Sequence, residues 1–461
     1  MKLIATIFTC AFIYWLFWLD RNRDERVSWA LWIPLIWFGI ICSRPVSFWV
    51  QPNQGTDYMD RFTGSSPLDA TAYGLLIAAG VLVLNRRAKR VKQFLQGNLP
   101  VLLYFFYCAL STAWSDDPAV AFKRWIKAAG EFVMILLVLT EFDTEGAIRR
   151  LYSRVGFVML PVSVLFIVYY PALGTTYDPT THVMMYTGVA TFKNLLGVLC
   201  MACGLAALWA FIGAYQDRDM PDRRRRMLAQ GIAVVLAVGL VVRADSMTSL
   251  SSFALAGAVM VVSSWTWVRR RPPALVAVYL AVIAAAGFAL FLSSGAGILQ
   301  ELGRNPTLTG RTLIWKAVLA QPINPIIGAG FESFWMGDRM TSVWSMSQVG
   351  IQQAHDAYLE MYLNLGWIGL ALLATMIVAG YRSALALYRR DPHAGSLRIA
   401  FITAAIVFGF TEAGFRMLSP DWFGFLLAVT AMPAMPGAAP QTKGSLFVRR
   451  PHPPAEVRIL Q

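Results

Sequence analysis

His355 is the residue of this sequence best suited to proton transfer. It is one of only four histidines, and it stands directly before an apolar run. A histidine side chain exchanges protons near neutral pH, so His355 is a candidate general base, although a lone histidine at such a boundary is more often structural. Asp356 follows it, but neighbours in a helix do not face one another. Asp356 therefore need not orient the imidazole.

Four cations lie at the ends of apolar runs or in the polar segments between them: Lys193, Arg243, Arg311 and Arg416. Such charges are costly beside a membrane and are retained mainly where they line a functional cavity or pair with a neighbour. Converging on one face, they suit a polyanion such as pyrophosphate, which arginine binds with two parallel hydrogen bonds. The alternative is that each reaches to lipid headgroups.

The segment Ser293 to Asp356 is a long polar interruption in an apolar chain, and it contains both Arg311 and His355. Thr309 can cap a short amphipathic helix that begins near Arg311 and is stopped by Pro322. Beyond it, the stretch 327–335 has two glycines and an aromatic rim. Glycine allows close approach, so we expect the backbone there to lie against a ligand.

The elements that position these residues are membrane helices. The 461 residues are 57% hydrophobic and 14% charged, with a mean hydropathy of +0.53, which is too apolar for a soluble domain. Apolar runs of roughly 17 to 25 residues cross a bilayer as helices. About thirteen occur, near 3–19, 28–43, 68–84, 99–114, 125–140, 151–170, 193–214, 227–243, 247–267, 274–293, 357–380, 398–413 and 421–437. We predict an all-α bundle of about 12–13 transmembrane helices.

The net charge of +14 follows the spans and does not indicate a nucleic-acid partner. Alternate connecting segments together with the C-terminal tail hold 27 of the 40 Lys and Arg residues. Since positive loops stay in the cytoplasm, this predicts that Arg86–Arg90 and Arg223–Arg226 are cytoplasmic, and that 293–356 is a large outward loop. The bundle then covers 1–437, and 438–461 is a Pro- and Arg-containing cytoplasmic tail that we expect to be disordered.

Metal and redox chemistry have weak support in the sequence. Asp217-Arg-Asp219 resembles a metal-binding Asp-x-Asp, but it lies in an Arg-rich cytoplasmic segment where charge compensation explains it. Cys200 and Cys203 lie within an apolar run and are interpreted as small buried hydrophobic residues. We therefore expect neither a metal site nor a cofactor.

An ordered set of motifs resembles the O-antigen ligase and polymerase superfamily. They are Thr-Gly-Arg311-Thr-x-x-Trp315, Ile-x-Gly328-Ala-Gly330-Phe, Ala-His355-Asp356-x-Tyr358-Leu and Leu-Gly366-Trp-Ile-Gly369. With Lys193-Asn194, the similarity covers about 187–370, and within the superfamily it is greatest to exopolysaccharide polymerases of the succinoglycan type.

The resemblance implies a glycan polymerase of the bacterial inner membrane whose active face is periplasmic. Its substrates would be oligosaccharides on undecaprenyl pyrophosphate, and its partners membrane lipids and other polysaccharide assembly or export proteins. His355 would activate the acceptor, and Arg311 with Arg243, Lys193, Asn194 and Arg416 would bind the pyrophosphate. Glu332 is a second candidate base, while Asp356, Trp315 and Trp335 would contact the glycan.

Two departures from the family pattern and three alternatives accompany this interpretation. Phe192 replaces a usual histidine before Lys193, and Asp356 replaces a common asparagine. The first alternative is a ligase that moves a finished glycan to lipid A or protein. The second is a transporter of lipid-linked sugar or a small solute, and the third is a structural scaffold. Charges within the spans are sparse, which argues against transport.

Overall fold

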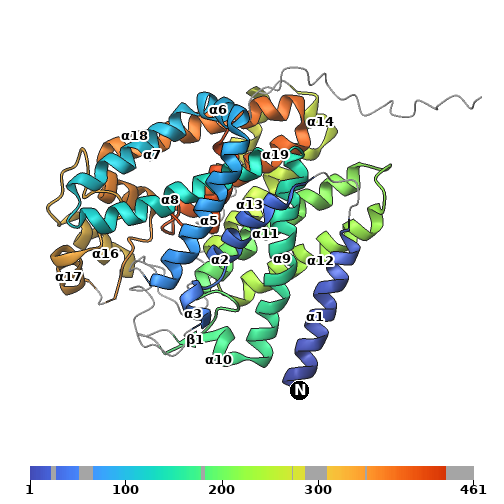
Figure 1. The fold of residues 1–461 in the computed structure, drawn as a ribbon, viewed down its shortest axis with the longest axis horizontal. Coiled ribbons are helices and arrows are strands. Elements are labelled where there is room, and N and C mark those ends of the chain that lie inside the picture. Colours follow the sequence, from blue (N-terminus) through green and yellow to red (C-terminus); the bar gives the residue numbers. More distant parts are fainter. Residues whose placement is uncertain are drawn as a thin grey trace, which may run out of the picture.

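The structure is a computed structural model that describes residues 1–21, 27–50, 66–177, 182–271, 274–285, 309–347 and 350–431. This part of the chain is almost entirely helical, as predicted (Figure 1). Its one sheet pairs β1 (Thr175–Tyr177) antiparallel to β2 (Met184–Tyr186). The predicted tail 438–461 lies outside the described residues.

Eight helices of the described chain are long and apolar enough to cross a membrane. They are α1 (Lys2–Leu19), α5 (Pro67–Arg86), α9 (Thr144–Tyr169), α11 (Lys193–Gln216), α12 (Arg223–Arg243), α13 (Met247–Ser264), α18 (Ala357–Arg390) and α19 (Pro392–Gly409). A ninth span results if α6 (Ala88–Gly97) and α7 (Leu99–Ser111), bent by 89°, count together. The protein is thus a multi-pass membrane bundle.

The prediction of twelve to thirteen full spans is too high for the described chain. Two of the remaining runs form short helices, α2 (Trp32–Ile41) and α20 (Pro420–Val429), and a third is described only over Ala274–Ala285. The fourth is α8 (Pro118–Leu139), which has Arg124, Lys127 and Glu131 among its apolar residues. Apolar runs of a polytopic protein can be buried short helices, which hydropathy alone does not distinguish from spans.

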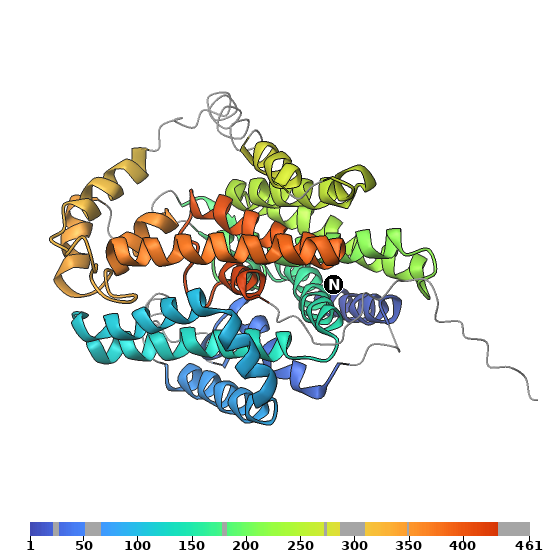
Figure 2. The ribbon, with the colours of Figure 1, turned by 90° about the horizontal axis from the view of Figure 1, so that it is seen from above.

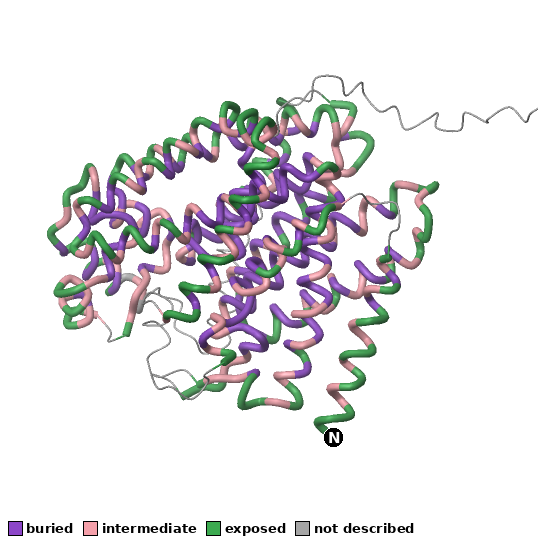
Figure 3. Tube along the Cα trace, in the orientation of Figure 1, coloured by how far each residue is buried: buried purple, intermediate pink, exposed green. Residues whose placement is uncertain are grey.

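Burial divides the bundle into a centre and a periphery (Figure 3). In the apolar window of α11, 83% of the residues are buried inside the protein, against 11% for α1. The helix α11 packs against α9, α12, α13 and α19. Lys193 and Asn194 are half-buried in the first turn of this central helix.

The described part of the predicted outward loop folds as a small unit beside α18. It contains α16 (Thr309–Leu319) and α17 (Gly337–Met346), which lie at one side of the bundle in Figure 2. Its own core joins Ile314, Val318, Phe334 and Val343 to Leu363 of α18. The helix expected near Arg311 is confirmed and ends before Pro322. Residues 293–308 lie outside the described chain.

A short non-helical segment, Phe410–Ser419, returns the chain into the bundle between α19 and α20; we call it the 410–419 loop. Phe415 and Leu418 have φ values of 55° and 59°, which are uncommon for residues with side chains. The buried Glu131 carboxylate of α8 accepts a hydrogen bond from Leu418 N at 2.9 Å. Every residue of the following helix, α20, is buried, so the loop is anchored at its carboxyl end.

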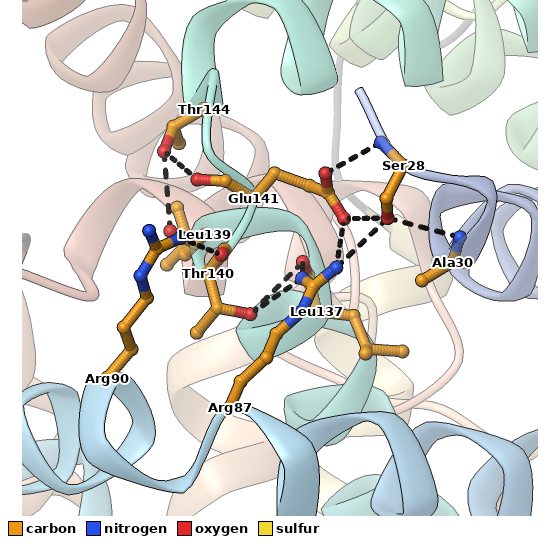
Figure 4. Close-up of polar contacts among 9 residues, drawn as sticks. All are labelled: Ser28, Ala30, Arg87, Arg90, Leu137, Leu139, Thr140, Glu141 and Thr144. Atoms are coloured by element: carbon orange, nitrogen blue, oxygen red, sulfur yellow. Dashed lines mark hydrogen bonds and ion pairs between the residues drawn. The ribbon is translucent and has the colours of Figure 1, made fainter. Parts of the chain in front are cut away.

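A polar cluster of Ser28, Arg87, Thr140 and Glu141, the Glu141 cluster, joins the ends of α5 and α8 (Figure 4). Arg87 Nη2 donates to Glu141 Oε1 at 2.6 Å, and Ser28 donates through both its amide, at 2.9 Å, and its hydroxyl, at 2.6 Å. Burial raises the pKa of Glu141, but these bonds outweigh it, so the net pKa is lowered.

Candidate functional site

A buried carboxylate, Glu412 of the 410–419 loop, is the centre of the candidate site. Its Oε2 lies 3.2 Å from His355 Nδ1. Its Oε1 accepts from Asn194 Nδ2 at 3.0 Å and from Arg311 Nη2 at 3.4 Å. We call Asn194, Arg311, His355 and Glu412 the Glu412 cluster. It brings together three residues that the sequence predicted for one site.

Each member of the Glu412 cluster comes from a different segment. Asn194 lies in the first turn of α11, and Arg311 lies in the first turn of α16. His355 precedes α18 in a left-handed conformation, with φ of 52°. The Glu412 side chain is 10% exposed, but those of Arg311 and His355 are each 26% exposed. The carboxylate therefore lies beneath the two functional groups that solvent and substrate can reach.

Asp356 has a structural task next to His355. Its carboxylate caps α18 by accepting a hydrogen bond from Leu359 N at 2.8 Å. Burial raises the pKa of Asp356 above its ordinary value. The imidazole contact comes from Glu412, which is distant in sequence. A glycan-binding role for Asp356 stays a prediction.

Lys193 and Arg243 lie beside the Glu412 cluster in different pairs. Lys193 Nζ is 3.7 Å from the Asp245 carboxylate. The Arg243 guanidinium stacks 4.0 Å from the Tyr186 ring centroid and donates to its hydroxyl at 2.7 Å. A hydrogen bond of 2.9 Å from Thr411 to Thr248 joins the first turn of α13 to the 410–419 loop. The two cations thus have partners of their own outside the Glu412 cluster.

Glu332, which lies between α16 and α17, forms a second ion pair with Arg416 of the 410–419 loop. Arg416 Nε donates to Glu332 Oε2 at 3.0 Å, and Arg124 of α8 donates to the Glu332 carbonyl oxygen. We call Arg124, Glu332 and Arg416 the Glu332 cluster. A small cavity of about 30 Å³ adjoins it, lined by Glu332, Arg416, Glu360 and Asn364 with apolar side chains.

The two predicted sugar-stacking tryptophans differ in their surroundings. Trp315 is half-buried and donates its indole N–H to the Ala354 carbonyl oxygen at 2.8 Å. Trp335 is buried, and its indole N–H lies 3.0 Å from both carboxylate oxygens of Glu360. Glu360 also accepts from the Ala354 amide. These bonds hold the segment before His355 in place.

The glycines at 327–335 approach backbone of the protein, where the sequence suggested a ligand. Gly328 and Gly330 have φ values of 67° and 100°. Ala329 N donates to Leu363 O at 3.0 Å, and Gly330 N donates to Asn364 O at 2.8 Å. These bonds lie at a break in α18, where Gly366 has φ of 64°. Glycine is needed on both sides because the two backbones touch.

Sequence reasoning missed Glu412 and Glu360. A carboxylate at a membrane boundary is as expensive as a cation and is retained for the same reasons. Glu412 sits four residues before Arg416, at the end of the run 398–413, and the same argument would have selected it. In the described residues, no group of three or more His, Cys, Asp or Glu is placed to hold a metal.

Fold and site together define a multi-pass membrane protein in which one buried carboxylate contacts an arginine, an asparagine and a histidine. Comparison with known proteins then identifies the family that it resembles. Residues 232–374 match the family model described as O-Antigen ligase. The chain is also 25% identical over 349 residues to the exopolysaccharide production protein ExoQ of Rhizobium meliloti (strain 1021), covering 73% of this chain and 77% of that protein. The resemblance to the O-antigen ligase and polymerase superfamily is confirmed.

Proposed function

We propose that this protein is a glycan polymerase of exopolysaccharide biosynthesis. It would transfer a growing chain from undecaprenyl pyrophosphate to a lipid-linked repeat unit at the periplasmic face of the inner membrane. The family match and the similarity to an exopolysaccharide production protein support a polysaccharide polymerase or ligase. The observation that carries the proposal is the contact of Glu412 with both His355 and Arg311.

The transfer forms one bond and breaks another. An acceptor hydroxyl oxygen attacks the anomeric carbon of the donor, and the bond between that carbon and the diphosphate oxygen breaks. The acceptor proton passes to His355, a contribution worth about 10²- to 10⁴-fold. Arg311, together with Lys193 and Arg243, stabilises the departing diphosphate. The diphosphate leaves as a stable anion, so the proposed transfer requires no metal.

Glu412 positions both groups in this mechanism. Its carboxylate faces Nδ1, so a proton held there leaves Nε2 as the proton acceptor. The same carboxylate draws Arg311 to the imidazole and so places the leaving group beside the base. Asn194 donates a third hydrogen bond and fixes the carboxylate plane. In this proposal, Trp335 and Glu360 are structural, and Glu332 belongs to the separate Glu332 cluster.

The test is reconstitution of the purified protein in lipid with synthetic lipid-linked repeat units and no ion gradient. We expect a ladder of lipid-linked polymers that persists in EDTA. Single repeats that stay unextended would contradict the proposal. Extension without a gradient would also exclude transport as the main activity, and loss of it in His355→Ala would exclude a scaffold role.

A ligase is the second candidate, and the family description is the observation that favours it. Ligation uses the same donor chemistry with another acceptor, on lipid A or protein. Mass spectrometry of the material that accumulates in a deletion strain separates the two. A polymerase defect leaves single lipid-linked repeats, whereas a ligase defect leaves full-length lipid-linked chains.

A further inference from the structure

The 410–419 loop contributes one charged residue to each of two clusters, a carboxylate to one and a cation to the other. In the Glu412 cluster the loop supplies the carboxylate, and α11, α16 and the segment before α18 supply the partners. In the Glu332 cluster the loop supplies a cation, Arg416, and its partner Glu332 comes from the segment between α16 and α17. Both clusters therefore depend on one short segment but draw on different helices.

Two guanidinium groups converge on Glu332. Arg416 binds its carboxylate, and Arg124 binds its backbone carbonyl. Arg124 is only 7% exposed, and its Nε has no hydrogen-bond partner among the described residues. The nearby Glu360 carboxylate accepts from Trp335, Ala354 and Asn364. Arg124 thus has a donor to offer beside the ion pair of Arg416 and Glu332, and two guanidinium groups together suit an anion larger than one carboxylate.

We propose that Arg416 and Arg124 form a second anion subsite, which binds the diphosphate of the acceptor lipid in exchange for the Glu332 carboxylate. This inference rests on the proposed function, in which both substrates are lipid-linked diphosphates. The adjoining cavity of about 30 Å³ has room for about one water molecule. A diphosphate therefore fits only after the Glu332 side chain has moved aside.

The chemistry of the two substrates assigns each subsite. In the donor, the anomeric carbon is bonded directly to the diphosphate, so that diphosphate must lie beside the base. Arg311 meets this condition because it shares Glu412 with His355. In the acceptor, the attacking hydroxyl and the diphosphate are at opposite ends of a repeat unit. Its diphosphate belongs with cations of a separate cluster, and Arg416 and Arg124 are such cations.

The experiment supplies one lipid-diphosphate-linked polymer as donor and compares two acceptors that differ only in the presence of the diphosphate. One is a repeat unit on a prenyl diphosphate, and the other is the same unit on the same prenyl chain through a neutral ether. The wild-type protein should prefer the diphosphate acceptor by about tenfold or more in kcat/KM, the scale of one lost charge-assisted bond. Arg416→Gln should reduce this preference to near one. Arg311→Gln should lower kcat with both acceptors and keep the preference.

Glu332→Gln adds a variant that removes charge with little change of shape. If Glu332 competes with the diphosphate, this variant should lower KM for the diphosphate acceptor and leave the neutral one unchanged. A preference unaltered in Arg416→Gln would overturn the subsite, as would a wild-type protein that elongates both acceptors equally; the proposed function would stand in either case. A wild-type protein that elongates neither acceptor overturns both.

Discussion

The Glu412 and Glu141 clusters are built from similar groups and have different designs. Glu141 accepts bonds of 2.6 to 2.9 Å from Ser28 and Arg87, and its side chain is 2% exposed. Glu412 accepts longer bonds of 3.0 to 3.4 Å, and its side chain is 10% exposed. Arg311 and His355 are each 26% exposed, against 18% for Arg87. Short contacts among buried groups stabilise a fold, whereas longer contacts with accessible partners leave those partners able to bind a substrate. We call the Glu141 cluster the closed cluster and the Glu412 cluster the open cluster.

The largest expected effect is loss of the base in the open cluster. His355→Ala should lower polymer formation by about 10²- to 10⁴-fold, because it removes the proposed proton acceptor. Radiolabelled lipid-linked repeats and gel analysis of the product measure this. The variant should remain in the membrane at the wild-type level. Polymer of normal length would refute the role given to His355.

Glu412→Gln tests positioning, with Glu141→Gln as the matched control at the closed cluster. Loss of the Glu412 charge loosens both His355 and Arg311, and a misplacement of about 1 Å costs about 10²-fold in rate. We expect kcat to fall by this order while the protein stays folded. Glu141→Gln should retain the wild-type kcat. Equal losses of activity in the two variants would remove the distinction between the clusters.

The open cluster also depends on the break in α18. A Cβ at Gly366 would lie 2.3 Å from Ile326 O, and the residue has φ of 64°. Gly366→Ala should therefore displace the segment that leads to His355 and reduce both thermal stability and activity. Gly337→Ala is the control, because it has φ of 55° but nothing within 4 Å of the added carbon. Similar melting temperatures of the two variants would argue against a structural need for the close contact between Gly366 and Ile326.

The smallest effect is the pH dependence of the closed cluster. The folded pKa of Glu141 is lowered, so its contribution to stability is present above the unfolded value of about 4.3 and is lost as pH falls below it. Glu141→Gln should lower stability near neutral pH by about 1–3 kcal/mol. Its loss of stability on acidification should be smaller than that of the wild type. Parallel pH curves of melting temperature would contradict this sign.

The local predictions that held rested on residue type and periodicity. The helix near Arg311 and the membrane bundle each follow from short stretches of sequence. In the described residues, eight or nine helices are long and apolar enough to span, fewer than the predicted 12–13, because short apolar helices such as α20 also appear as hydrophobic runs in the sequence. The glycine stretch was expected to face a ligand, but it faces the backbone of α18. The two glycines in the sequence indicate that the backbone can approach another group closely, but they do not indicate which group that is.

The sequence by itself determined that this is a membrane bundle, and its distribution of arginines predicted which segments face outward. Those properties depend on composition and on the energy of placing groups in lipid, which act residue by residue. Only the tertiary structure decided that Glu412 joins Asn194, Arg311 and His355, which lie up to 218 residues away along the chain. It also separated Arg416 from Arg311 and gave it Glu332 as a partner. Contacts between distant residues depend on how helices and loops pack, and no local pattern specifies that.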